Sequence, residues 1–106
     1  MSSSTIAQED RSIGVIAAAP WRITNCRVLP GYCLAVTFRD GCMGILDCST
    51  ILTSSHPGIY APLANQDYFS KVKIELGVLT WPNGADLDPS WMYKQLRDRK
   101  TWSVPF

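Results

Sequence analysis

The chain has 106 residues, a net charge of +1 and a sequence pI of about 7.7. This length suits one domain, and a hydrophobic share of 46% argues against an intrinsically disordered chain. The near-neutral balance differs from that of basic nucleic-acid-binding domains, whose pI usually exceeds about 9. Charged residues make up only 18% of the chain, so we expect apolar surface to spare for self-association or a partner.

Residues 1–19 are expected to form a flexible leader. Glu9 and Asp10 stand where a secretory signal peptide carries positive charge. The apolar run 13–19 is too short to cross a membrane. We therefore expect a cytoplasmic protein without a membrane anchor. Residues 13–17 could add an edge strand or cover part of the core.

Three strands are expected at the start of the body: 21–29, 32–38 and 43–47. Pro30-Gly31 favours a type II turn, and Asp40-Gly41 favours a hairpin. Leu34, Val36 and Phe38 recur at every second position, which predicts one strongly apolar face. The three strands are expected to form an antiparallel meander.

The second half of the body predicts a hairpin and two helices. Residues 72–75 and 78–81 flank Leu76-Gly77 and should pair as strands. Asn65 can cap one helix. Asp88, followed by proline, can cap a second that runs to about residue 99. The tight turn that precedes this helix contains Asn83-Gly84.

These elements predict an α+β fold for a single domain at residues 20–100, with an aromatic C-terminal tail at 101–106. An antiparallel sheet of about five strands, a meander plus a hairpin, should pack with the two main helices. Trp81 and Trp91 should also pack in the core. The other core residues expected are Leu34, Val36, Phe38, Ile45, Phe69, Ile74, Leu79, Met92 and Leu96.

Several short motifs follow one another in a fixed order. They are Leu29-Pro30-Gly31-Tyr32, Phe38-Arg39-Asp40-Gly41, Asp47, Tyr60-Ala61-Pro62-Leu63 and the stretch from Val78 to Pro89. In this order they resemble a bacterial family known only as domain of unknown function 2442. The resemblance covers about two-thirds of the chain, from Trp21 to Tyr93.

The resemblance implies a small α+β domain with no established catalytic residues. Genes of this family often lie beside those of another small domain, in pairs that resemble toxin–antitoxin systems. Some relatives add a helix-turn-helix domain and look like regulators. A protein partner encoded by the adjacent gene is therefore what the resemblance implies.

Four polar residues are the candidates for chemistry: Asp47, His56, Asp86 and Asp88. Asp86 and Asp88 could stabilise the turn and cap the helix, or they could form a cation site or an acid/base pair. Asp47 could bind the chain that leaves its strand, or it could face a cleft together with Asp86. His56, the single histidine, lies in a loop composed of Ser, Pro and Gly.

The four cysteines stand at positions 26, 33, 42 and 48. Their gaps lack the Cys-x-x-Cys spacing of zinc ribbons and thioredoxin-like sites, and disulfide frameworks are typical of secreted proteins. We expect four reduced thiols, no metal and no cofactor.

Three aromatic residues are the candidates for an interaction: Trp21, Trp102 and Phe106. Trp21 is expected near an open sheet edge. Trp102 and Phe106 could dock on another chain, because tryptophan is enriched at interface hot spots, or they could dock on their own sheet. We expect a protein-binding module that forms a homodimer and is not an enzyme. The alternatives are a dimeric nucleic-acid-binding regulator and, third, a small enzyme.

Overall fold

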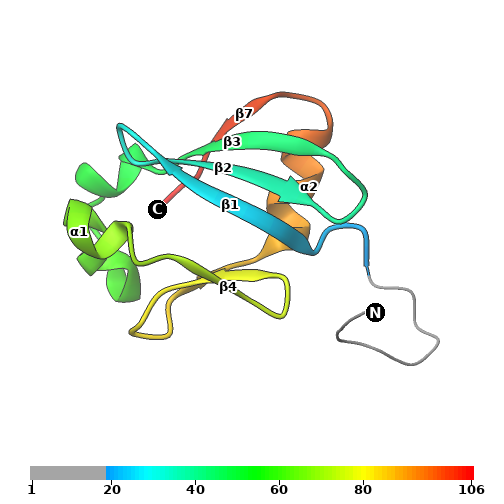
Figure 1. Cartoon of the computed structure of the whole chain (residues 1–106). Helices are drawn as coiled ribbons and strands as arrows, with labels where there is room; N and C mark the ends of the chain where they lie inside the picture. The colour runs from blue at the N-terminus through cyan, green and yellow to red at the C-terminus, as the bar shows by residue number, and fades with distance from the viewer. Residues whose placement is uncertain (1–18) are drawn as a thin grey trace.

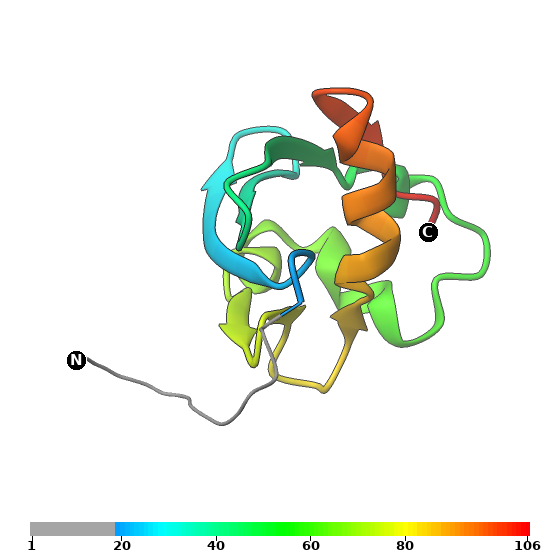
Figure 2. The same cartoon turned by 90° about the vertical axis from the view of Figure 1, so that its right-hand side faces the viewer.

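The computed structural model describes residues 19–106. The expected leader and its apolar run 13–17 therefore lie outside the described residues, apart from Ala19. The fold is α+β, as the sequence predicts. Its strands form two sheets, and its helices lie at one end and along one side of them (Figures 1 and 2).

The larger sheet has four strands in the order β1-β2-β3-β7. β1 (Ile23–Leu29), β2 (Cys33–Phe38) and β3 (Met43–Asp47) form the antiparallel meander that the sequence predicts. Gly31 has a φ of 76°, which fits the glycine position of the expected turn between β1 and β2. β7 (Thr101–Ser103) joins the sheet parallel to β3.

The smaller sheet has three antiparallel strands in the order β4-β5-β6. β4 (Lys73–Glu75) and β5 (Val78–Thr80) form the predicted hairpin, and β6 (Asp86–Leu87) adds a short third strand. The two sheets meet where the Ile23 N–H donates to the carbonyl of Gly77 over 3.0 Å.

Two predicted helix caps are confirmed. Asn65 Oδ1 accepts from the Tyr68 N–H at the start of α1 (Gln66–Phe69), and Asp88 accepts from the Ser90 N–H at the start of α2 (Pro89–Arg97). α1 is a single turn, and two 3-10 helices, η2 (Ser49–Leu52) and η3 (Gly58–Ala64), precede it.

The prediction of one antiparallel sheet with two main helices therefore differs from the structure in three ways. Within residues 19–106 there are two sheets, β7 is parallel to its neighbour β3, and α2 is the one α-helix longer than a single turn. The C-terminal segment does not stand apart from the sheet, because β7 pairs with β3 and Val104 is only 3% exposed. α2 returns the chain to β3, which allows the parallel pairing.

One hydrophobic core connects the two sheets and α2. The predicted core residues that are buried are Leu34, Val36, Phe38, Phe69, Leu79, Trp81, Met92 and Leu96. Ile45 and Ile74 are half-buried. Trp91 is 45% exposed, and its assignment to the core is wrong. Met92 and Leu96 face the core at helical spacing, so Trp91, one position earlier, is rotated away by about 100°.

Candidate interaction surfaces

The motif tyrosines hold the chain together. The Tyr32 hydroxyl donates to the carbonyl of Ala64 over 2.6 Å, and the Tyr60 hydroxyl donates to the carbonyl of Asp86 over 2.7 Å. Each bond connects a turn or a 3-10 helix to a distant part of the chain. Such segments have few internal hydrogen bonds of their own. At these two positions, the motifs that carry the family resemblance therefore have a structural role.

Asn83 has the same kind of role in the turn before α2. Its Nδ2 donates to the carbonyl of Ile59 and its Oδ1 accepts from the Ala85 N–H, both over 3.0 Å. Its own N–H donates to the Tyr68 hydroxyl over 2.8 Å. Gly84 has a φ of 88°, which confirms the predicted tight turn.

Asp47 binds the chain that leaves β3. Its Oδ1 accepts from the Ser49 N–H over 3.0 Å. The Ser49 hydroxyl and this N–H hold the pKa of the carboxyl below its ordinary value. The first of the two roles considered for Asp47, as a ligand of the local backbone, is the one that the geometry favours.

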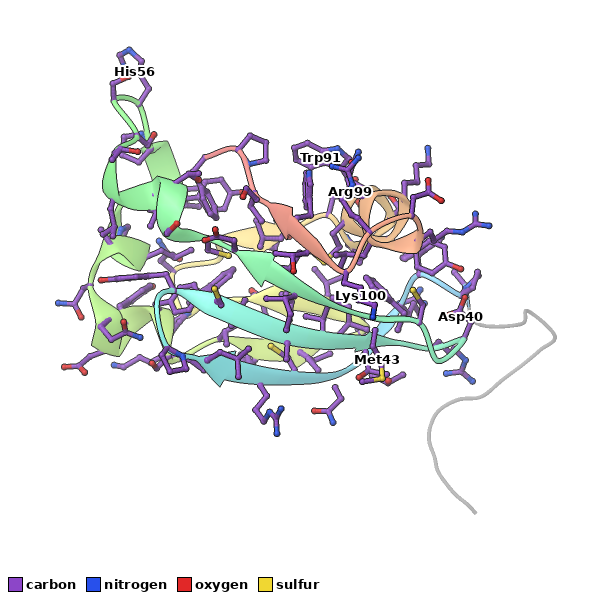
Figure 3. All side chains as sticks on the ribbon, turned by 90° about the horizontal axis from the view of Figure 1, so that it is seen from above. Asp40, Met43, His56, Trp91, Arg99 and Lys100 are labelled. Atoms are coloured by element: carbon purple, nitrogen blue, oxygen red, sulfur yellow. The ribbon has the colours of Figure 1, made fainter. Side chains whose placement is uncertain are left out.

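The structure does not gather the four candidate polar residues into one site. Asp86 and Asp88 line the same groove, but Asp47 lies on β3 and His56 lies in the loop before η3. His56 projects from one end of the molecule, far from the other labelled side chains (Figure 3). Within residues 19–106, no three His, Cys, Asp or Glu side chains are placed to hold a metal ion.

The groove beside Asp86 and Asp88 is lined by aromatic side chains, and we call it the tryptophan groove. It encloses about 200 Å³ between η3, β6, α2 and β7, and its lining includes Tyr60, Asp86, Asp88, Trp91, Met92 and Trp102. The Trp91 and Trp102 rings meet edge-to-face, with centroids 4.9 Å apart. Phe106 packs against Tyr60 with centroids 5.2 Å apart. The aromatic tail thus docks on its own domain.

Both groove carboxylates are near hydrogen-bonding side chains. The Ser90 hydroxyl and N–H donate to Asp88 Oδ1 over 2.7 and 2.9 Å, and the hydroxyl bond is the first cause that lowers the pKa of this carboxyl. Partial burial, followed by the charge of Asp86, raises the pKa of the Tyr60 hydroxyl. The negative charge of Asp86 therefore acts on another group that lines the groove.

A second groove crosses the face of the four-stranded sheet that points away from the core, and we call it the outer groove. It encloses about 560 Å³, and its lining includes Asn25, Arg27, Ala35, Met43, Ile45 and Lys100. Figure 3 looks down on this face, where Met43 and Lys100 lie close together above the strands. Met43 is 68% exposed.

The sequence predicts Ile45 in the core and so gives no indication of the outer groove. Ile45 and Leu46 are adjacent apolar residues of β3, and successive strand residues point to opposite faces. Leu46 is the one that is buried, at 0% exposure. The apolar pair could have signalled a strand with two apolar faces.

Trp21, the remaining candidate, lies just before the edge strand β1, as expected. It is half-buried, and the Arg22 guanidinium lies 5.5 Å from the centroid of its ring. Trp21 lines neither groove. It therefore contributes to neither candidate surface.

The chain belongs to the family described as protein of unknown function (DUF2442), which it matches over residues 23–98. The match includes β1 through α2 and ends before β7. No curated protein and no solved structure matches the chain significantly. Within residues 19–106, no helix has both the length and the apolar character needed to cross a membrane.

Proposed function

We propose that the protein is a protein-binding module whose partner docks in the outer groove. The observation that supports this is the exposed apolar surface there, with Met43 at 68% exposure beside Ile45 and Ala35. Exposed apolar surface rimmed by polar groups is typical of interaction sites. The product of an adjacent gene is the proposed partner, in an antitoxin-like or adaptor role within a bacterial two-gene system in the cytoplasm.

The charges at the rim indicate what the partner should offer. Arg27 and Lys100 border the groove, and Asp47, an acid that follows on the same strand β3, already binds Ser49. A complementary partner surface would carry apolar side chains with carboxylates around them. A second copy of the same face would bring cations against cations, which disfavours self-association through this groove.

Binding accounts for these features better than catalysis does. A small enzyme would need a nucleophile, base or acid held together in a cleft. In the described part of the chain, neither His56 nor Asp47 is among the residues that line the tryptophan groove with Asp86 and Asp88. We propose that the protein is not an enzyme and needs no cofactor.

We also propose self-association into a symmetric dimer through the free edge of β1. The Phe38 N–H donates to the Cys42 carbonyl on the β3 side of β2. Because hydrogen-bonding groups alternate along a strand, the N–H and C=O groups of Cys26 and Val28 point away from β2. Such an edge can pair with a second copy of itself.

The docking proposal is tested with two matched substitutions of exposed apolar residues. Met43→Asp changes the outer groove, and Leu76→Asp changes a residue that is 87% exposed in the β4–β5 turn. Partners are captured from the native host by wild-type protein, identified by mass spectrometry and then purified for a binding titration. We expect Met43→Asp to weaken binding by tenfold or more and Leu76→Asp to leave it unchanged. A purified partner that binds both variants alike, or DNA binding with a steep salt dependence, contradicts the proposal.

A further inference from the structure

We propose that the tryptophan groove binds a cationic side chain, arginine or lysine, of a protein partner. The proposal rests on the proposed function in one respect, namely that the cation belongs to a protein partner. The groove itself is separate from the outer groove, and it combines two features that suit a cation: indole faces and carboxylate charge.

The indole rings are available for binding. Trp91 is 45% exposed although it packs edge-to-face on Trp102. Such a pair uses one ring's face and the other ring's edge, and both rings line the groove. A cation that lies within about 6 Å of a tryptophan face is attracted by the ring quadrupole, most strongly when the site is partly desolvated.

The negative charge comes from Asp86 and Asp88 at the same groove. Among pairs of described residues, the one ion pair is Lys73–Glu75, so neither carboxylate of the groove is paired with a described lysine, arginine or histidine. Asp88 Oδ1 already accepts hydrogen bonds from the Ser90 hydroxyl and N–H over 2.7 and 2.9 Å. Asp86 is therefore the carboxylate best placed to meet an incoming cation.

Part of the groove lies outside the family match. Trp102 and Val104 follow residue 98, where the match ends, whereas Tyr60 and Asp86 lie within it. β7 brings the two parts together by pairing with β3. The C-terminal segment thus completes the tryptophan groove, and residues within the family match form the rest of it.

The test uses a five-residue peptide with a central arginine and the same peptide with citrulline, its neutral analogue. The indole N–H signals of the four tryptophans are followed by NMR during each titration. We expect the Trp91 and Trp102 signals to move saturably with the arginine peptide. Trp81, whose Nε1 donates to the Phe69 carbonyl over 3.0 Å, serves as the internal reference.

Two variants and a control complete the experiment. Trp91→Ala should abolish the shift at Trp102, and Asp86→Asn should weaken arginine binding about two- to fivefold, as expected for an exposed charge pair. Asp67→Asn, at an exposed carboxylate on α1, should change nothing. Equal binding of the citrulline peptide, or no effect of Asp86→Asn, overturns the inference. If Trp91→Ala abolishes peptide binding but leaves the complex with the purified partner intact, this inference is overturned and the proposed function still stands.

Discussion

On the inner face of the four-stranded sheet, Leu34 and Leu46 are fully buried, whereas Met43 on the outer face is 68% exposed. Both faces belong to the same strands, because side chains alternate between them. The inner face is closed by α2 and the smaller sheet, and within residues 19–106 nothing comparable covers the outer face (Figures 2 and 3). Substitutions on the outer face should therefore cost little stability.

The largest difference between the faces is expected at two neighbours in β2. Phe38 is 1% exposed and packs edge-to-face on Tyr93. Phe38→Ala should lower the free energy of unfolding by about 3–5 kcal/mol, since it leaves a cavity in the core. Thr37→Ala, on the outer face, should change it by less than about 0.5 kcal/mol. Urea unfolding measures both, and similar values for the two variants would contradict the division into faces.

A second prediction probes the close contact between β3 and α2. A Cβ added at Gly44 would lie 2.7 Å from Leu96 Cδ2, so Gly44→Ala should destabilise the fold by about 1–3 kcal/mol through overpacking. The same change made in a Leu96→Ala background should cost much less, because the clashing atoms are gone. Additive effects of the two substitutions would show that this contact does not limit the packing.

The third prediction concerns Asp47, an outer-face residue whose carboxylate accepts a hydrogen bond from the backbone of a neighbour. Asp47→Ala removes the acceptor of the Ser49 N–H and should cost about 1 kcal/mol at pH 7. Because the folded pKa of Asp47 lies below its ordinary value, its carboxylate stabilises the fold above the unfolded pKa of about 3.9. This stabilisation is lost as the pH falls through the folded pKa. Unfolding curves from pH 7 to pH 3 should therefore converge for the two proteins.

The sequence predicts the local elements well because their signals are local. The cap residues Asn65 and Asp88 mark helix starts, and Asp40-Gly41 marks the turn after β2. Strand β7 has three residues and pairs with β3 more than fifty positions earlier, and no short-range pattern specifies such pairing. The two-residue strand β6 was missed for the related reason that it is defined only by its partner β5.

The candidate surfaces were predictable only in part, for the same reason. The sequence indicates Asp86 and Asp88 as a pair and Trp102 on its own, but the groove that unites them depends on β7. The sequence predicts Trp91 in the core because it flanks the turn before α2, but its helical position turns it outward. To predict the outer groove, one must know which of Ile45 and Leu46 points outward. Two adjacent apolar residues in a strand do not indicate this.

The last prediction compares cysteines of the two faces and requires no change in stability. Cys48 is 0% exposed, and burial raises its pKa; burial also raises the pKa of Cys26, on the inner face, to about 11. Cys33 points outward, and its pKa is raised by partial burial and then by Asp47. Because the thiolate is the reacting form, alkylation of native protein at pH 8 should modify Cys33 before Cys26, and Cys48 last. Mass spectrometry of timed samples gives the order, and a denatured control without reductant should label all four thiols. If Cys48 reacted as fast as Cys33 in native protein, the inner face would have to open on the timescale of labelling. The two faces would then differ in how they are packed, but not in how accessible they are to the reagent.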